Sequence, residues 1–366
     1  MSPLTRAQML ASQLNLKMPK NDWADLCRRI KDGTVVPVVG NGLRNDGIFD
    51  WFFPAPPDQP ALTVDESLSQ LWAEKLSYPL LDTVNLARVA LYNRVVCKDD
   101  EEAAVNYLLF LKSILLLAAS TDPLVKDRVP ALESQIEQKS FSDLAVELDY
   151  PRFDPGKEDP LRILARLQLP IYLTTSYYDF LERALEAEGR TPTTQLCFWK
   201  GEPPNVAAEH KTAYDLEPTK ARPVVYHLFG LEIYPSTLVL SEGDYLDYLL
   251  HIISDMKSTA TSTTNPIVPR YVRTALFSSS LALVGFRLQD WDFRVLYRLI
   301  RQNDIQRYNV LVQVSAEQLA RELKSSEVRK FLEMYFKDTF TLQWGGPDEF
   351  VYQLNAEYKK WMQIDS

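Results

Sequence analysis

Short apolar runs alternate with amphipathic segments over much of the chain, and this alternation predicts an α/β fold. The apolar runs are rich in β-branched residues and bounded by polar or glycine-containing turns, which is typical of buried strands. The predicted strands are residues 34–39, 171–174, 224–227, 237–240, 281–284, 310–314 and 339–343. The predicted helices between and around them include residues 5–31, 161–167, 178–187, 244–256 and 291–301. Strands and helices that alternate in this way favour a Rossmann-like, mostly parallel sheet flanked by helices.

One long segment breaks the alternation. Residues 64–148 have helical apolar spacing throughout, and residues 47–63 before them are rich in proline and aromatic residues, as in a loop. The most apolar stretch, Tyr107–Ala119, contains Lys112 and is too short to span a bilayer. We therefore expect three parts: residues 1–63 with an N-terminal helix, the first strand and a glycine turn; residues 64–150 as a helical insertion; and residues 151–366 as the remainder of the Rossmann-like domain.

Composition and charge narrow the class of protein. The 366 residues are 46% hydrophobic and 24% charged, as in a globular protein, and the net charge of −9 disfavours direct binding to nucleic acid. The N-terminus has no apolar signal-peptide core, so we expect a cytoplasmic protein without membrane attachment. Cys27, Cys97 and Cys197 are far apart and form no C-x-x-C pair, which argues against a zinc ribbon, a disulfide framework or a bound metal.

The clearest candidate for ligand binding is the turn Gly40-Asn41-Gly42, directly after the first strand. Glycines let the backbone N–H groups of such a turn approach a phosphate closely. The motif lacks the third glycine of the dinucleotide fingerprint, and plain tight turns also use glycine. The chain contains no G-x-x-x-x-G-K-[ST] sequence, which disfavours an ATPase or GTPase of the P-loop kind.

Three further strand ends carry polar residues, and in open α/β sheets ligands bind at this edge. In residues 174–179, Thr175 or Ser176 could cap the next helix or face a ribose. His227 could be a buried, hydrogen-bonded histidine or a general base. In residues 285–290, Asp290 could cap a helix while the glycine turn encloses an adenosine or ribose. Spacing alone leaves both interpretations open at each place.

Taken in order, these segments resemble the sirtuin-like NAD-binding domain, particularly its branch in prokaryotic antiviral defence proteins. Residues 36–43 (VPVVGNGL) look like the glycine-rich opening of that domain, and residues 225–230 (VYHLFG) are similar to its histidine segment. Further similar segments are residues 86–90 (LARVA), 173–176 (LTTS), 238–245 (LVLSEGDY), 283–288 (LVGFRL) and 290–294 (DWDFR).

The resemblance implies a hydrolase that cleaves the nicotinamide–ribose bond of NAD, as an effector that depletes NAD in antiphage defence. The implied catalytic residues are His227, as base or ribose contact, and Ser176, at the position of the family's asparagine. The residues expected to contact NAD are Gly40, Asn41, Gly42, Leu43, Thr174, Thr175, Asp179, Gly230, Gly285, Phe286 and Arg287. A homo-oligomer is also expected, with a sensor or activator protein from a neighbouring gene.

The chain departs from the family pattern at two points. Its three scattered cysteines cannot build the four-cysteine zinc module of deacetylating sirtuins, so protein deacetylation is not expected. Serine at position 176 lacks the paired donor and acceptor of an asparagine amide. This leaves a second hypothesis, a non-catalytic module that binds NAD or ADP-ribose and regulates or scaffolds a larger complex. A third is an interaction protein that works through the helical region 64–148.

Overall fold

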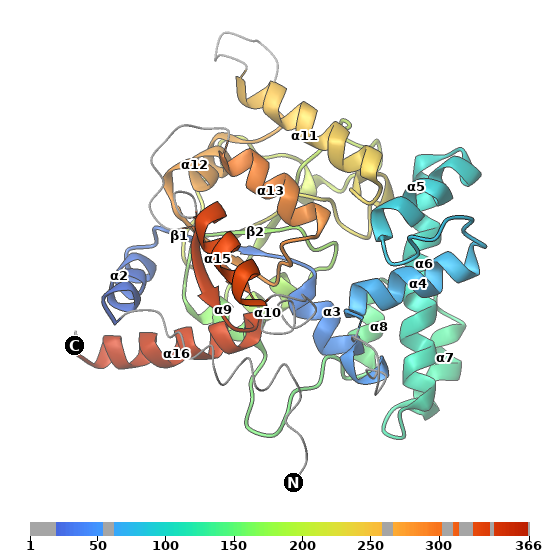
Figure 1. Cartoon of the computed structure of the whole chain (residues 1–366), viewed down its shortest axis with the longest axis horizontal. Coiled ribbons are helices and arrows are strands. Elements are labelled where there is room, and N and C mark those ends of the chain that lie inside the picture. The colour runs from blue at the N-terminus through green and yellow to red at the C-terminus, as the bar shows by residue number, and fades with distance from the viewer. Residues whose placement is uncertain are drawn as a thin grey trace.

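A single parallel sheet organises the molecule and confirms the α/β, Rossmann-like prediction. The computed structural model describes residues 20–53, 62–257, 266–301, 310–314, 325–336 and 340–364. The seven strands stand in the order β3-β4-β2-β1-β5-β6-β7, and each neighbouring pair is parallel (Figure 1). They are β1 (Val35–Val39), β2 (Ile171–Thr174), β3 (Thr193–Leu196), β4 (Val224–His227), β5 (Ser280–Val284), β6 (Val310–Val314) and β7 (Thr341–Trp344).

Helices cover both faces of the sheet, which explains why the central strands are continuous apolar runs. Successive side chains point to opposite faces, so Val39 and Tyr172 belong to the first core cluster, whereas Val38 and Leu173 belong to the second. The first core is covered by α2 (Lys20–Lys31), α9 (Pro160–Arg166), α10 (Phe180–Ala187) and α16 (Pro347–Ile364). The second is covered by α11 (Glu242–Lys257), α12 (Arg270–Ser278), α13 (Trp291–Arg301) and α15 (Ser325–Phe336).

Residues 64–148 are helical, as predicted, and lie together on one side of the sheet (Figure 1). We call them the helical layer: α4 (Val64–Lys75), α5 (Leu86–Cys97), α6 (Asp100–Thr121), η2 (Lys126–Arg128), α7 (Val129–Glu133) and α8 (Phe141–Glu147). Side chains fix where these helices begin. Thr63 and Glu66 form a capping box at α4, Ser140 and Asp143 form another at α8, and Asp99 caps α6.

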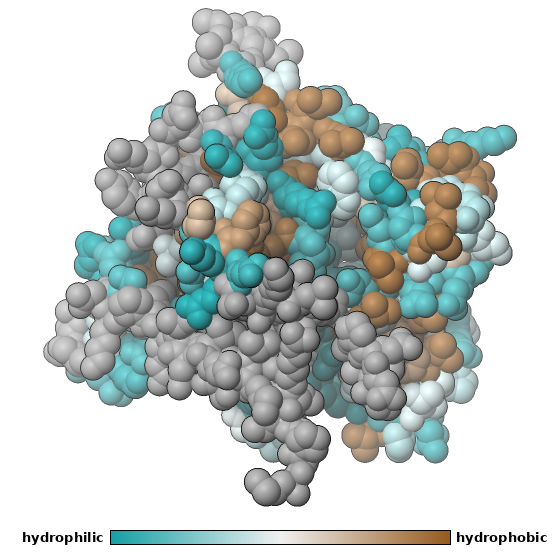
Figure 2. Space-filling view, viewed as in Figure 1, coloured by the Kyte–Doolittle hydropathy of each residue, from teal (hydrophilic) through white to brown (hydrophobic). Residues whose placement is uncertain are grey.

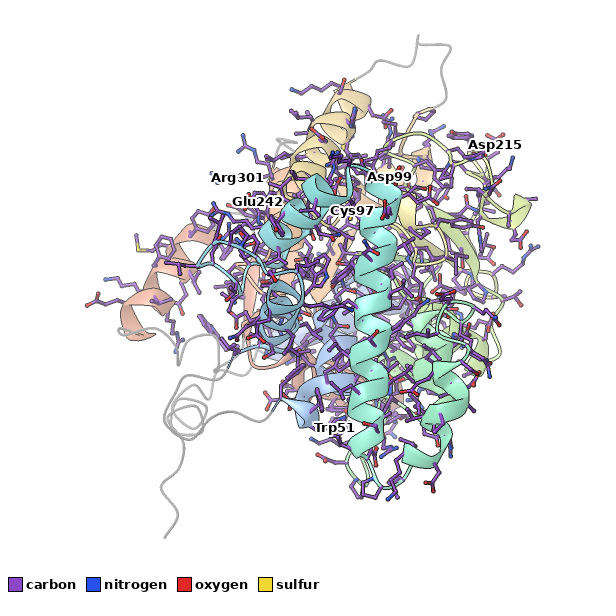
Figure 3. The ribbon with its side chains drawn as sticks, turned by 90° about the vertical axis from the view of Figure 1, so that its right-hand side faces the viewer. Trp51, Cys97, Asp99, Asp215, Glu242 and Arg301 are labelled. Atoms are coloured by element: carbon purple, nitrogen blue, oxygen red, sulfur yellow. The ribbon has the colours of Figure 1, made fainter. Side chains whose placement is uncertain are left out.

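The longest helix, α6, begins after Asp99 and runs through the helical layer (Figure 3). Among the described residues it is the one helix long and apolar enough to cross a membrane. However, 61% of its apolar window is buried inside the protein, and Tyr107, Leu111 and Leu115 are part of the first core. The helix therefore has the packing of a core helix in a globular protein.

Several local predictions were wrong. Residues 237–240 form no strand: η4 (Pro235–Thr237) ends there, and the following residues are buried by packing, with Val239 N bonded to Phe229 O at 3.2 Å instead of to a neighbouring strand. The predicted loop at 47–63 is partly helical, because α3 (Gly42–Phe49) and η1 (Asp50–Phe52) occupy its start, while residues 54–61 lie outside the described residues. Residues 5–19 of the predicted first helix also lie outside them. Sequence reasoning missed the edge strand β3 and the helix α12.

Candidate functional site

The sheet brings the four predicted strand ends into one row. In the strand register, Val39 is paired with Thr174 on one side and with Val284 on the other, and Thr174 is paired with His227. The turns that follow these residues therefore leave the same edge of the sheet. The chain continues from β1 to β2 on one side and from β5 to β6 on the other, so the strand order reverses between β1 and β5. Such a reversal opens a crevice in which α/β proteins bind ligands.

Glycines allow the two turns at this crevice to touch. A Cβ atom on Gly40 or Gly42 would lie 2.7 Å from the carbonyl oxygen of Gly285. Gly285 has a φ of +82°, and its own Cβ would lie 2.7 Å from Leu43 N. The glycines at 40 and 42 thus serve close backbone packing, and neither has a positive φ. Ligand binding by this turn stays a prediction.

The start of α3 nevertheless offers free donors at the crevice. The first N–H groups of a helix, here those of Gly42 and Leu43, have no carbonyl of a preceding turn to bond. Asn41 stands at the N-cap position, but its side chain makes no capping hydrogen bond, and its Oδ1 is buried without a partner. Uncapped N–H groups at a helix start attract anions such as a pyrophosphate.

The hydroxyl groups after β2 hold the turn in place instead of capping α10. Thr174 Oγ1 donates to Val39 O at 2.9 Å and accepts from Ser176 N at 2.9 Å. Ser176 Oγ accepts from Tyr178 N at 3.3 Å. The N-cap of α10 is Asp179, which makes no side-chain cap, so of the two interpretations left open for Thr175 and Ser176 the structure does not show the capping of α10.

His227 is fully buried, and both of its ring nitrogens are engaged. Nδ1 lies 2.9 Å from Ser176 O, and Nε2 lies 2.8 Å from Glu182 Oε1. Both partners accept, so the ring donates from both nitrogens as an imidazolium. Burial lowers the pKa of His227, but the Glu182 carboxylate and the Ser176 carbonyl outweigh it, and the pKa is raised overall. In this conformation the ring has no free nitrogen for the predicted role as a base.

Glu182 was missed by sequence reasoning, although one signal could have found it. It lies on the buried face of α10 among Phe180, Leu181, Ala184 and Leu185. A charged residue inside an apolar stripe needs a partner. Oε1 of Glu182 accepts from His227 and also from Thr194 Oγ1 at 3.0 Å, whereas Oε2 is buried without a partner.

Two residues predicted to contact NAD have other partners in the structure. Asp179 forms an ion pair with Arg183, Oδ1 to Nε 2.7 Å, and its N–H donates to Ser142 Oγ of the helical layer at 3.4 Å. Gly230 has a φ of +87°, and a Cβ there would lie 2.5 Å from Thr237 O, so this glycine is required for packing. Neither observation places these residues toward the crevice.

Arg287 lies at the crevice but is neutralised by two carboxylates that sequence reasoning missed. Its Nη1 lies 2.7 Å from Asp65 Oδ2 and its Nη2 lies 2.6 Å from Asp46 Oδ1. Asp65 also accepts from Asn45 Nδ2 at 2.9 Å. Burial lowers the pKa of Arg287, but the neighbouring carboxylates raise it overall, so the guanidinium keeps its charge.

Two more carboxylates lie beside them at the start of α13. Asp292 Oδ2 accepts from Thr175 Oγ1 at 3.2 Å, which joins the ends of β2 and β5 across the end of β1. Burial and the Asp65 carboxylate raise the pKa of Asp292 to about 7, against hydrogen bonds from Phe293 N and Thr175. Burial and Asp292 raise the pKa of Asp290. Burial also raises the pKa of Asp46 to about 7.

A small cavity lies between the ends of β1 and β2. Its volume of about 10 Å³ is close to the space that one water molecule needs. Ser176 and Arg44 line it, and the buried guanidinium of Arg44 pairs with Asp159 at 3.1 Å and stacks over Phe180 at 4.8 Å. This cavity is too small to hold a dinucleotide.

Comparison with known protein families identifies the part of the chain that contains most of these strand ends. Residues 170–337 match the family model of the SIR2-like domain. This part of the chain is a sirtuin-like domain, with the NAD-related function that such a domain suggests. The match contains β2, β4 and β5 with their turns, whereas β1 and its glycines precede it. No curated protein matches the chain.

Within the described ranges, no group of three or more histidine, cysteine, aspartate or glutamate side chains is arranged to hold a metal ion. The cysteines are free thiols at separate places: Cys27 on α2, Cys97 at the end of α5 and Cys197 directly after β3.

Proposed function

We propose that the protein is an NAD glycohydrolase that cleaves NAD to nicotinamide and ADP-ribose. The observation that carries the proposal is the row of strand ends at Val39, Thr174, His227 and Val284. The turns that follow these strand ends meet at one edge of the sheet, and the SIR2-like domain forms part of that sheet. The uncapped start of α3 suits the pyrophosphate, and the buried oxygens without partners at Asn41, Asn45 and Glu182 suit a ligand rich in hydroxyl groups.

In the proposed reaction, the bond between ribose C1′ and the nicotinamide nitrogen breaks, and its electron pair stays on the nitrogen. The oxygen of a water molecule bonds to C1′, and the water releases one proton. The transition state resembles an oxocarbenium ion, as in glycoside cleavage. Ser176 would orient the water or ribose, and His227 with Glu182 would hold the turn that carries Ser176, through the 2.9 Å contact to its carbonyl.

The closed packing of the site supports activation by assembly or by a partner. The crevice has to open before NAD can enter, and binding of a second protein can supply the free energy for such a change. Apolar side chains lie exposed over α11 and on the side of the molecule that α4 and α5 form (Figure 2). They include Leu80, Leu81, Val95, Val96, Leu246 and Leu250. We propose that this surface forms a homo-oligomer, in a cytoplasmic antiphage effector that a neighbouring gene's product triggers.

Nicotinamide release tests the enzymatic proposal. The purified chain is incubated with NAD alone and with the product of the adjacent gene, and nicotinamide is quantified. Ser176→Ala should lower the rate at least about tenfold, because it removes the hydroxyl that orients water or ribose. Ser120→Ala on the exposed side of α6 is the matched control and should not change it. No release under any condition, with the fold intact, would exclude hydrolysis.

A second candidate is a module that binds NAD or ADP-ribose without cleaving it. It is favoured by the occupied ring nitrogens of His227 and by serine at position 176. Calorimetry separates the two candidates: NAD binding without nicotinamide release supports the module. If neither nucleotide binds, an interaction role of the helical layer becomes the better explanation.

A further inference from the structure

The proposed hydrolysis releases a proton from water, and the histidine at the strand ends is not free to accept it. Both ring nitrogens of His227 already donate to protein oxygens. Two carboxylates of the crevice, Asp46 and Asp65, each have an oxygen engaged by Arg287, at 2.6 and 2.7 Å. The carboxylates that follow β5 are not held in this way within the described part of the chain.

One of these carboxylates, Asp292 in the first turn of α13, contacts the turn after β2. Its Oδ2 accepts from Thr175 Oγ1 at 3.2 Å, and Thr175 directly precedes Ser176. Thr175 N donates to Val39 O at 3.0 Å, so this contact lies where β1 ends, at the crevice. Asp292 is partly exposed, whereas His227 is fully buried. The carboxylate is thus the accessible one next to the residue that the proposed reaction assigns to the water or ribose.

The Asp292 carboxylate also has room for a further hydrogen-bond donor. Among the described residues, its Oδ1 accepts from Phe293 N at 2.6 Å, its Oδ2 accepts from Thr175, and neither oxygen takes part in an ion pair. An ionised carboxylate offers about four lone-pair sites, so sites remain for a water molecule. A group that can hold a water by its O–H is placed to take that proton.

The groups around Asp292 determine the pH at which it can act as a base. The titratable groups that face it are Asp65 on α4, Tyr177 after β2, Tyr245 on α11, and Arg287 and Asp290 before α13. Burial and Asp65 raise the pKa of Asp292 to about 7, against its hydrogen bonds and Arg287. Burial also raises the pKa of Asp290 and of both tyrosines, which therefore keep their protons near neutral pH. Asp292 is the member of this group that becomes ionised there, as a general base requires.

We propose that Asp292 is the general base of the hydrolysis and takes the proton of the water molecule that attacks ribose C1′. As the water oxygen bonds to C1′, one of its O–H bonds breaks and the proton bonds to an Asp292 oxygen. The bond from C1′ to nitrogen breaks with its electron pair on nicotinamide, which leaves as a neutral molecule. Asp292 then loses the proton to solvent. Thr175 is a positioning residue, and the inference rests on the proposed hydrolysis of NAD.

The pH dependence of nicotinamide release tests the proposal. In the wild type, kcat/KM should rise about tenfold per pH unit up to a midpoint near 7 and then level off, because the base must be ionised. Asp292→Asn should lower kcat/KM at pH 8 by about 100-fold or more and abolish this rise, since an amide takes no proton. Asp22→Asn, at an exposed aspartate in the first turn of α2, is the matched control and should change neither.

Two further variants distinguish a base from a structural role. Thr175→Val removes a hydrogen bond from the ionised carboxylate, so the midpoint should move to higher pH by about half a pH unit or more. If Asp292 only held the two turns together, the rate would fall at every pH and the midpoint would stay. Asp46→Asn should keep the rise, although burial also raises the pKa of Asp46 to about 7.

The outcomes separate this step from the hydrolysis itself. A wild-type kcat/KM that does not vary between about pH 5.5 and 9, an unchanged profile in Asp292→Asn, or loss of the rise in Asp46→Asn alone would each overturn the proposal and leave hydrolysis standing. No nicotinamide release by the wild type under any condition would refute hydrolysis, and this step with it. Calorimetry with ADP-ribose should show binding by Asp292→Asn within about threefold of the wild type, because the proton transfer belongs to the reaction and not to product binding.

Discussion

His227 and Glu182 form a buried charged pair whose strength depends on pH. The 2.8 Å contact and the raised pKa of His227 mean that folding favours the protonated ring. The free energy that this contributes is fully present below the usual histidine pKa of 6.5 and is lost as the pH rises through the higher folded value. The histidine at the end of β4 therefore contributes to stability whatever its role toward NAD.

His227→Gln should destabilise the chain, and more strongly at low pH. At pH 6 we expect a loss of about 3 kcal/mol, because Glu182 keeps a buried charge without its cation. At pH 9 the loss should be smaller. Urea unfolding at both pH values measures it, and His251→Gln on the exposed side of α11 is the control. A loss independent of pH would show that the ring is neutral in the folded chain.

The glycines at the crevice give a second prediction at this scale. Gly40→Ala should lower the free energy of unfolding by about 1–3 kcal/mol, because its Cβ would meet the backbone oxygen of Gly285 at 2.7 Å and force the two turns apart. Gly346→Ala is the matched control, since nothing lies within 4 Å of its added Cβ. Thermal or urea unfolding measures both variants, and equal effects would contradict the packing argument.

The sequence identifies single residues of the site better than it identifies their partners. Gly40 and Gly285 follow recognisable strands and His227 ends one, so their place at the sheet edge could be predicted. Arg287 could be predicted at the same edge, but its partners Asp46 and Asp65 are 241 and 222 positions away in the chain. Local patterns carry no information on such contacts, so these ion pairs appear only in the folded chain.

At the scale of elements, predictions succeeded where a strand is apolar and followed by a helix. β1, β2, β4 and β5 meet this condition because both faces of the sheet are buried. The edge strand β3 has the sequence TTQL, which is too polar and short to stand out. Residues 237–240 are apolar enough for a strand, but the fold leaves them without a neighbouring strand to pair with. Pairing is a property of the assembled sheet, which explains both errors.

One residue, Glu232, links the helical layer to the candidate site through its carboxylate and its backbone N–H. Glu232, after β4, accepts from Phe141 N at the start of α8 at 2.5 Å, and also from the N–H and hydroxyl of Ser142. Its own N–H donates to Tyr177 O at 2.8 Å, in the turn after β2. The start of α8 and the turn that carries Ser176 are thereby held by one residue.

Glu232→Gln should loosen both segments. An amide keeps one acceptor for three donors, so we expect a loss of about 2 kcal/mol in the free energy of unfolding. Amides of α8 and of residues 176–179 should exchange hydrogen faster, which mass spectrometry can resolve. Glu333→Gln on the exposed side of α15 should change neither. If only α8 responded, the link to the turn after β2 would be refuted.

At the scale of the whole molecule, the helical layer and the sheet share one core. Trp72 and Tyr107 of the layer belong to the same buried cluster as Val39 and Tyr172 of the sheet. A shared core favours cooperative unfolding, since neither part can expose its face without the other. The helical layer thus has no buried cluster of its own, and the boundaries at residues 64 and 150 stay a prediction.

Ion pairs also join the helical layer to the rest of the molecule, and they allow a test of how tightly the two parts are coupled. Arg94 and Asp100 of the helical layer lie beside Lys200 and Asp244, which are outside it. Lys200 Nζ lies 3.0 Å from Asp100 and 2.9 Å from Asp244. Lys200→Met keeps an apolar stem over Trp199 but leaves Arg94 as the remaining cation of this group. The two carboxylates would then share one guanidinium.

We expect Lys200→Met to lower the opening free energy of α5 and of the first turns of α6 by about 1–2 kcal/mol, because contacts to a partly buried charge are lost. Native-state hydrogen exchange in urea measures the opening free energy of these helices and, in the same experiment, that of β1 and β2. The strands should change by less than about 0.5 kcal/mol, since the shared core is untouched. Lys211→Met, an exposed lysine paired with Glu202 at 3.4 Å, is the control. A loss of equal size in the helical layer and the sheet would mean that these ion pairs open only when the whole molecule unfolds. The helical layer could not then move separately to open the site.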